Sequence, residues 1–261
     1  MKTIIVNEKN LSIVQENSQR NVMALGFFDG VHRGHQKVII RAKEIANEKD
    51  CSLAVMSFFP HPKTVFSNQE VDYLMPMEQK AERLKDLGVD IFYIIEFTKE
   101  FAALSPETFI QEYLVKLQVK HAVAGFDYTY GKRGAGTIHT IAPHSQFTIG
   151  VEVVEKFEMY GSKVSSTNIR ELLQNGQIDT VTNLLGKPYQ VKYSFKEGVA
   201  PYYTLPEKGL YYVSIIFEGR MVSQTIYVQD GQTILFNREI SNQDCSIIFH
   251  HRVTQNEQVI S

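Results

Sequence analysis

The sequence of 261 residues contains no tryptophan and only two cysteines, Cys51 and Cys245, which lie far apart without the spacing of metal ligands. Two such thiols indicate neither a disulfide framework nor a zinc site, and they are typical of a reducing compartment. No apolar stretch approaches the length that spans a membrane, and the N-terminus acquires charge too early for a signal peptide. We therefore expect a cytoplasmic protein that does not cross a membrane.

An excess of charge of either sign is also lacking. The chain carries 27 Lys and Arg against 29 Asp and Glu, for a formal net charge of -2. Nucleic acids and anionic membrane surfaces are bound by broad basic faces. We therefore expect neither as a partner, and we expect basic residues to act locally. The sequence does not predict the oligomeric state.

Hydrophobic residues make up 43% of the chain, which is enough to bury the cores of two domains. Up to about residue 186, short apolar segments alternate with helical patterns, which predicts a doubly wound, Rossmann-like α/β fold with a parallel sheet. The expected strands are 22–25, 53–58, 91–97, 121–124 and 147–154. The expected helices are about 36–48, 77–87, 105–117, 166–175 and 178–185.

The pattern changes from helical to strand-like at Tyr189. The runs expected to form strands are 211–217, 223–228, 232–236 and 246–253. An Asp-Gly pair between two of them, Asp230-Gly231, is a strong indication of a hairpin. We therefore predict two domains, a nucleotide-binding α/β domain over 1–186 and a small antiparallel β-barrel over 187–261.

The most informative segment is 26–35, Gly-Phe-Phe-Asp-Gly-Val-His-Arg-Gly-His, which directly follows an apolar run. Its three glycines allow sharp turns and close approach of the backbone to a ligand, and a helix that begins here directs free N–H groups at an anion. His32 and His35, three residues apart, can donate hydrogen bonds to one phosphoryl group. The segment predicts nucleotidyl transfer, as in His-x-Gly-His nucleotidyltransferases.

Three further segments follow strands or approach a helix, where doubly wound sheets bind ligands. Residues 57–62 form a loop stiffened by two prolines. Residues 125–136 combine glycines and aromatic rings with a carboxylate and two cations, and 164–170 bring hydroxyl groups and an arginine to a helix start. Each has a structural alternative, namely a stiff loop, a core aromatic cluster and a plain N-cap at Ser165.

Together, the four segments resemble in order and spacing the adenylyltransferase module of the bacterial bifunctional riboflavin kinase/FAD synthetases, over residues 1 to about 186. The resemblance implies transfer of AMP from ATP to the phosphate of FMN, giving FAD and pyrophosphate. ATP and FMN would be the substrates and Mg²⁺ the cofactor. Such catalysis needs positioning and electrostatic stabilisation and no covalent nucleophile.

The resemblance also implies roles for individual residues. The catalytic residues would be His32, His35, Asp127 and Arg170. ATP would be bound by Gly26, Phe27, Asp29, Gly30, Gly34, Ser165, Ser166 and Thr167. The flavin would lie against Phe59, Pro60, His61, Pro62, Phe126 and Tyr130. Asp127 would orient the nucleotide or hold Mg²⁺.

The chain departs from the family pattern in both domains. Phe59 stands where Glu is common, and Tyr130 where Phe is common. In the second domain, the kinase element Gly-Arg-x-x-Gly-Phe-Pro-Thr-Ala-Asn is replaced over 192–206, although 209–213 (Gly-Leu-Tyr-Tyr-Val) resembles a strand of the kinase barrel. We therefore expect a degenerate kinase-like barrel without riboflavin kinase activity.

Two other functions remain open at this point. One is another His-x-Gly-His nucleotidyltransferase, acting on pantetheine phosphate, nicotinate mononucleotide or a cytidylyl substrate. The Phe-x-Pro-His-Pro loop of residues 58–62 and the barrel disfavour it. The other is a flavin- or nucleotide-binding regulator that has lost turnover and uses the barrel for interaction. Detection of FAD formed from FMN and ATP distinguishes the leading hypothesis from both.

Overall fold

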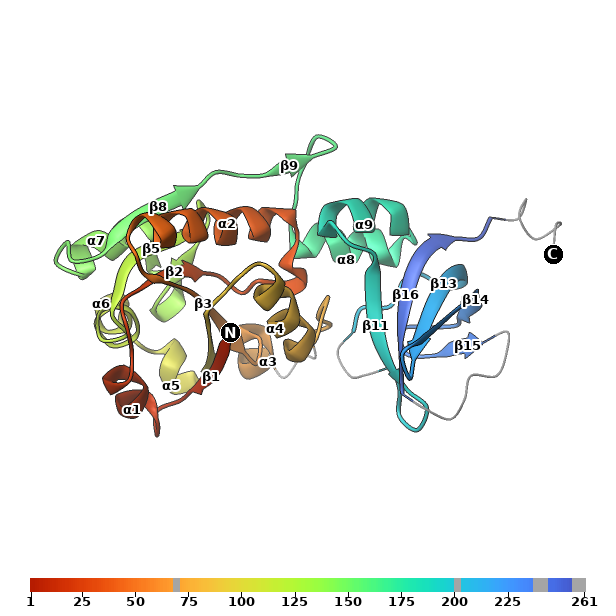
Figure 1. Cartoon of the computed structure of the whole chain (residues 1–261), viewed down its shortest axis with the longest axis horizontal. Helices are drawn as coiled ribbons and strands as arrows, with labels where there is room; N and C mark the ends of the chain where they lie inside the picture. The colour runs from red at the N-terminus through yellow and green to blue at the C-terminus, as the bar shows by residue number, and fades with distance from the viewer. Residues whose placement is uncertain (68–70, 200–202, 237–243, 255–261) are drawn as a thin grey trace. The chain divides into compact units, whose positions relative to one another are not determined.

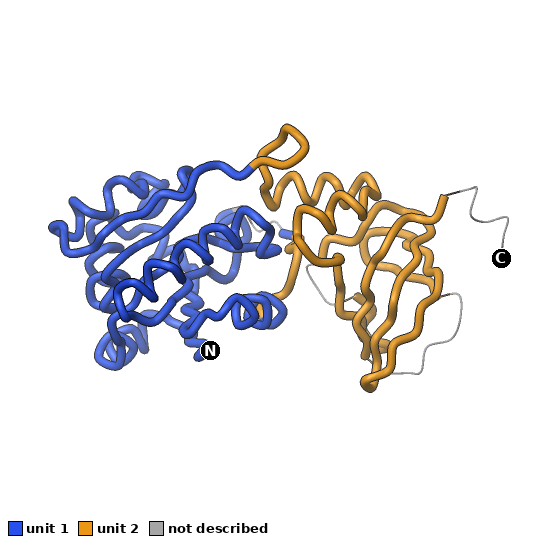
Figure 2. The backbone as a smooth tube through the Cα atoms, turned by 45° about the horizontal axis from the view of Figure 1, so that its top comes forward, with its two compact units in different colours: residues 1–71, 78–157 blue, residues 72–77, 158–261 orange. Residues whose placement is uncertain are grey.

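The computed structural model describes residues 1–67, 71–199, 203–236 and 244–254. The chain divides into two compact units (Figure 2), the first comprising Met1–Val71 and Glu78–Phe157 and the second Asp72–Met77 and Glu158–Ser261. The predicted division of the chain into two functional domains at residue 186 stays a prediction. In the part of the chain described, no helix has both the length and the apolar character needed to cross a membrane.

The first unit is built on a six-stranded parallel sheet (Figure 1) with the strand order β1-β4-β3-β2-β5-β8. Its strands are β1 (Lys2–Val6), β2 (Asn21–Leu25), β3 (Ser52–Phe59), β4 (Ile91–Glu96), β5 (Val119–Gly125) and β8 (Gly150–Val154). All five residues of β2 are buried, as expected for a central parallel strand. The prediction of a doubly wound α/β fold is confirmed.

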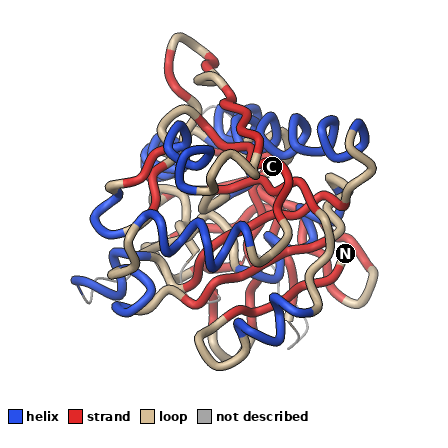
Figure 3. Tube along the Cα trace, turned by 90° about the vertical axis from the view of Figure 1, so that its left-hand side faces the viewer, coloured by secondary structure: helices blue, strands red, loops and turns tan. Residues whose placement is uncertain are grey.

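Helices cover both faces of this sheet, and their course can be followed in Figure 3. On one face lies α2 (Arg33–Glu48), which packs against β2, β3 and β5. Alternate residues of the strands point to the opposite face. There Met23 and Leu25 share a core with Phe109 of α6 (Pro106–Ile110).

Shorter elements connect the strands and helices of the α/β sheet. They are α1 (Leu11–Glu16), η1 (Asp29–Val31), α3 (Pro62–Ser67), α4 (Met77–Asp86), α5 (Lys99–Ala102), η2 (Gln111–Val115), β6 (Thr129–Tyr130), η3 (Lys132–Gly134), β7 (Gly136–Thr137), η4 (Ile138–Thr140) and α7 (Ile141–His144).

Three details of the first unit differ from the sequence-based expectations. The strand expected over 147–154 begins only at Gly150, because Phe147 lies in a turn at φ +59° with its side chain 80% exposed. The helix expected over 105–117 is α6 followed by the π-helical turn η2. The edge strand β1 was not among the expected strands.

The second unit contains two helices and an antiparallel β-barrel. Its elements are β9 (Glu158–Met159), β10 (Ser162–Lys163), α8 (Ser166–Gln174), α9 (Ile178–Leu185), β11 (Tyr189–Ser194), β12 (Gly198–Val199), β13 (Gly209–Phe217), β14 (Arg220–Val228), β15 (Ile234–Phe236) and β16 (Cys245–Arg252). The six barrel strands have the order β12-β11-β16-β13-β14-β15. The sheet curls so that the rings of Tyr193 and Phe236, near its two edges, lie 5.0 Å apart between centroids. The predicted small barrel is confirmed.

The loop after β5 depends on a close approach at Gly136, and this contact generates a prediction. A Cβ atom at Gly136 would lie 2.5 Å from ring atoms of Tyr130. We expect Gly136→Ala to lower the free energy of unfolding by about 1–3 kcal/mol through overpacking. Gly231→Ala, where a Cβ meets nothing within 4 Å, is the control, with an expected change below about 0.5 kcal/mol. Equal urea denaturation midpoints for both variants would contradict the prediction.

Candidate active site

The candidate site lies at the carboxyl edge of the parallel sheet, where the strand order reverses. The strand β2 has β3 on one side and β5 on the other, so the chain proceeds in opposite directions across the sheet from β2. Ligands of doubly wound sheets bind outside the carboxyl ends of the strands at such a point. The segments that follow β2, β3 and β5 are the first three predicted motifs. The fold therefore brings them to one edge.

The loop after β2 has backbone dihedral angles that are rare for residues other than glycine. Phe28 and Val31 lie at φ +53° and +41°, and Gly30 lies at +77°. A left-handed φ is an outlier for a β-branched residue such as Val31, and strained residues of this kind cluster in ligand-binding loops. Gly26 is also constrained, because a Cβ atom there would lie 3.0 Å from the Phe28 ring.

The two predicted histidines meet at the N-terminus of α2. His32 is the N-cap residue, and its Nδ1 accepts a hydrogen bond of 3.2 Å from the backbone N–H of His35. Because Nδ1 accepts, the proton of a neutral His32 ring lies on Nε2, which makes Nε2 a donor. The two imidazole rings stack at 3.5 Å between centroids and 17° between planes. The structure thus aligns two imidazoles where the helix dipole favours an anion.

Beneath this loop lies a buried lysine that the sequence analysis missed. Lys80 of α4 is 1% exposed, and its Nζ donates to the carbonyl of Phe27 at 2.8 Å and to Oγ of Ser57 at 3.4 Å. Burial lowers the pKa of Lys80 to about 8, while the buried Asp29 acts in the opposite direction. The sequence did contain one indication that Lys80 is buried, because it lies one helical turn before Leu84, on the same face of the helix, and Leu84 is buried.

The loop after β3 presents aromatic and imidazole rings. Phe59 is 43% exposed and precedes a cis peptide bond to Pro60. The His61 ring contacts the Phe27 ring edge-on at 4.7 Å, and its Nδ1 accepts from the Lys63 N–H at 3.1 Å. A further exposed ring that the sequence analysis did not single out is Phe66 of α3. The first two motifs are thus in direct contact.

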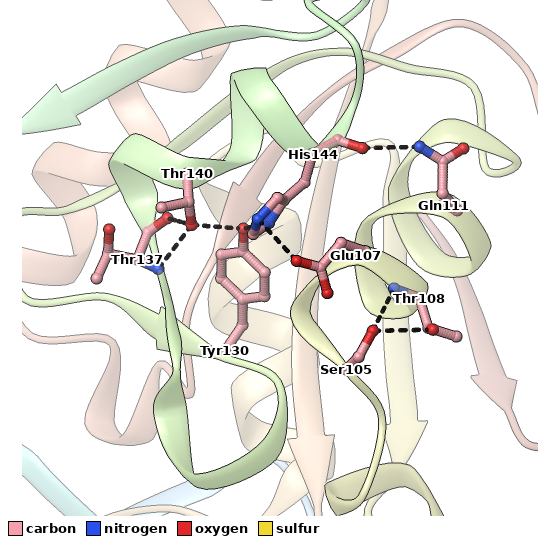
Figure 4. Close-up of polar contacts among 8 residues, drawn as sticks. All are labelled: Ser105, Glu107, Thr108, Gln111, Tyr130, Thr137, Thr140 and His144. Atoms are coloured by element: carbon pink, nitrogen blue, oxygen red, sulfur yellow. Dashed lines mark hydrogen bonds and ion pairs between the residues drawn. The ribbon is translucent and has the colours of Figure 1, made fainter.

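The loop after β5 separates exposed from buried residues. Phe126 is 42% exposed, and Asp127 is exposed beside it. Tyr130 is 6% exposed, and its hydroxyl lies 2.9 Å from Oγ1 of Thr140 and 3.0 Å from Nδ1 of His144 (Figure 4). His144 in turn pairs through Nε2 with Glu107 at 3.1 Å. These bonds anchor the loop to α6 and α7, and a contact of Tyr130 with flavin stays a prediction.

The fourth motif lies in the second unit, at the start of α8. Ser165 is its N-cap residue, and its Oγ accepts from the Asn168 N–H at 3.2 Å, as its structural interpretation predicts. Nε of Arg170 donates to the carbonyl of Asp72 at 2.7 Å. Ser166 and Thr167 form the first turn of the helix. Contacts of these residues with a triphosphate stay predictions.

Asp127 is the residue predicted to hold a magnesium ion. Within the described residues, no group of three or more His, Cys, Asp or Glu side chains is arranged to hold a metal ion. Mg²⁺ in nucleotide sites is commonly held by one or two carboxylates, substrate phosphates and water. The single exposed carboxylate of Asp127 is consistent with this arrangement, and its assignment stays a prediction.

Comparisons with known proteins agree with these features. A family model described as FAD synthetase matches residues 14–168. The bifunctional riboflavin kinase/FMN adenylyltransferase of Listeria monocytogenes is 38% identical over 277 aligned positions, covering 95% of this chain and 88% of that protein. The protein of the same name from Bacillus subtilis is 45% identical over 194 positions, covering 74% of this chain and 61% of that protein.

Two further comparisons add a shorter relative and a solved fold. An FAD synthetase of Listeria monocytogenes is 32% identical over 202 positions, covering 75% of this chain and 82% of that protein. A crystal structure described as a macrolide-efflux protein from Streptococcus pneumoniae matches with a TM-score of 0.83 at 24% identity, covering 97% of this chain and 100% of that one. That match shows a shared fold.

The buried Lys80 generates a prediction about pH. Its folded-state pKa of about 8 lies below the ordinary 10.5, so the unfolded chain binds more protons between these pH values. Stability therefore rises with pH over this range. We expect the unfolding free energy of the wild type, relative to Lys80→Met, to increase by about 3 kcal/mol between pH 7 and pH 10.5. Urea denaturation across this range measures it.

The matched control for this prediction is Lys85→Met, which changes an exposed lysine of the same helix. It should leave the pH dependence of unfolding as in the wild type. A constant difference between wild type and Lys80→Met from pH 7 to pH 10.5 would show that Lys80 does not titrate at a lowered pKa.

Proposed function

The chain belongs to the FAD synthetase family of nucleotidyltransferases, and we propose that it transfers AMP from ATP to the phosphate of FMN, giving FAD and pyrophosphate. The observation that carries this proposal is the stacked pair His32 and His35 at the N-terminus of α2. The pair adjoins a strained loop at the edge of the sheet where ligands of this fold class bind. The relatives' names support FMN and ATP as the substrates.

In the proposed reaction, an oxygen of the FMN phosphate attacks the α-phosphorus of ATP. The bond from that phosphorus to the α–β bridging oxygen breaks, and pyrophosphate leaves with the electron pair. Charge increases on the α-phosphate oxygens, where His32 through Nε2–H, His35 and the N–H groups of α2 act as fixed donors. Asp127 would hold a Mg²⁺ ion carried with the nucleotide, and the positive charge of this ion would offset repulsion between the two phosphorylated substrates.

The remaining site residues have proposed roles in binding. Exposed rings hold a flat ring system well, and we assign the flavin to Phe59, Phe126 and the additional ring of Phe66. Pro60, His61 and Pro62 shape the same loop. The glycines of 26–34 and the backbone around Asp29 would cradle the phosphates. Ser166, Thr167 and Arg170 are the proposed triphosphate contacts from α8.

For the barrel, we propose the absence of riboflavin kinase activity. In the stretch that replaces the kinase element, Thr204 donates through its N–H at 3.0 Å and its Oγ1 at 3.3 Å to the carbonyl of Tyr73. Tyr203 beside it is buried as well. Residues 200–202 of the same stretch lie outside the described residues. The bonds of Thr204 to Tyr73 thus lie within the second unit.

A cytoplasmic location is also part of the proposal. The structure records Cys51 and Cys245 as free thiols. Free thiols persist in reducing compartments.

The function is tested by incubating the purified chain with ATP, Mg²⁺ and either FMN or riboflavin, then separating the flavins chromatographically. We expect FAD from FMN and no FMN from riboflavin. FMN formed from riboflavin above a control without enzyme would contradict the proposed loss of kinase activity. Flavin binding without any product would favour the regulator, and no reaction with FMN would contradict the proposed synthetase.

The histidine assignment predicts a large loss of turnover from small changes. We expect His35→Ala and His32→Asn each to lower FAD formation by roughly a hundredfold or more, about 3 kcal/mol of barrier, because each removes a fixed donor. Asparagine at position 32 is chosen because it is a strong N-cap residue and preserves the helix start. His139→Ala, at an exposed histidine, is the control. Normal turnover in either site variant removes that histidine from the mechanism.

A further inference from the structure

The buried ammonium group of Lys80 is unusual because its surroundings are poor in charge. Among the described residues, Asp29 is the one charged group that acts on its titration, and the Lys80 Nζ also lies 4.6 Å from the centre of the Phe27 ring, within cation–π range. Lysine is almost never fully buried, and an apolar residue of similar volume often fills such a position with equal or greater stability. Packing alone therefore does not account for a lysine here.

The main contact of Lys80 is with one atom of the loop between β2 and α2. The carbonyl oxygen of Phe27 accepts from Lys80 Nζ at 2.8 Å and from Ser57 Oγ at 2.7 Å. Two donors from two different elements, α4 and β3, thus fix the peptide group between Phe27 and Phe28. Both donors lie on side chains that are buried.

The bonds that fix the Phe27 carbonyl also fix the N–H of Phe28, which belongs to the same peptide group. A peptide group is planar and trans, so the N–H of Phe28 points away from Lys80 and Ser57. Within the part of the chain that the structure describes, this N–H donates to no protein acceptor. Phe28 itself is held at φ +53° immediately before η1. The hydrogen bonds of Lys80 and Ser57 to the Phe27 carbonyl therefore set the direction in which the loop presents the Phe28 N–H.

We propose that Lys80 is a positioning residue for nucleotide binding, which holds the Phe27 carbonyl so that the Phe28 N–H is presented to a phosphate group of ATP. The proposal rests on the proposed function for the identity of the ligand. The same lysine reaches the second motif, because the Phe27 ring over which it lies also contacts the His61 ring at 4.7 Å. Lys80 thus supports the loops after β2 and β3 together.

The test compares the wild type with Lys80→Met, Ser57→Ala and the control Lys85→Met, all in the full chain. Dissociation constants for ATP and for adenosine are measured by titration calorimetry. We expect Lys80→Met to bind ATP at least tenfold more weakly, about 1.4 kcal/mol, with a smaller loss for Ser57→Ala. Adenosine, which lacks phosphates, should bind within twofold of the wild type throughout. Lys85→Met should match the wild type for both ligands.

Two results would overturn the inference while the wild type still binds ATP and forms FAD. One is an unchanged dissociation constant of Lys80→Met for ATP. The other is an equal loss of affinity for ATP and for adenosine, which is the result expected if the substitution only loosens the loop. Should Lys80→Met fail to fold by circular dichroism, Ser57→Ala decides by the same criterion. A wild type that binds no ATP would refute the proposed function and this inference with it.

Discussion

The placement of β2 between two parallel neighbours is the constraint on which the candidate site depends. All five of its residues are buried, and it pairs with β3 on one side and β5 on the other. Its chain can leave the sheet only at the carboxyl edge, where the chains that leave β3 and β5 emerge as well. Apart from the single turn η1, the first helix after β2 is α2, which begins at Arg33. The N–H groups of α2 are therefore brought to the same edge as the three loops.

The loop between β2 and α2 is held from two sides by polar contacts. On one side the His32 ring caps α2, which fixes both its rotamer and its tautomer. On the other side Lys80 and Ser57 hold the Phe27 carbonyl. Donors that are fixed before the substrate arrives need little reorganisation as charge develops, which is the main source of electrostatic catalysis. Val31, at φ +41°, donates its N–H to the Phe28 carbonyl, and its own carbonyl accepts from the Gln36 side chain, so further bonds hold this strained residue.

The sequence was sufficient for those features that depend on local pattern. Buried parallel strands such as β3 are continuous apolar runs, and α2 has a regular apolar face, so both were predicted. The strand β1 was missed because it is a short edge strand whose Ile5 is exposed. The π-helical turn η2 depends on an extra residue per turn that no periodicity argument distinguishes from an α-helix.

Within the candidate site, the sequence predicted which motifs bear chemistry but not which side chains of a motif are exposed and which are buried. Tyr130 and Phe126 belong to one glycine-rich segment, yet Tyr130 bonds to Thr140 and His144 while Phe126 is exposed. Lys80 lies outside every motif, and the role proposed for it rests on a tertiary contact with a backbone atom. Side-chain direction in a loop depends on packing against distant elements, which a local pattern does not encode.

Lys80 and Tyr130 illustrate one physical means of holding the loops of the candidate site. Each is a buried polar side chain that anchors a loop, Lys80 through a backbone carbonyl and Tyr130 through a hydroxyl network. Burial shifts both pKa values toward the uncharged form, downward for Lys80 and upward for Tyr130, so each polar group loses free energy of solvation. An apolar residue at either position avoids that loss but supplies no directional bond. Hydrogen bonds are directional and fix the geometry of a loop, whereas apolar contacts let its side chains shift. A site that would act by positioning its ligands therefore favours a buried polar group.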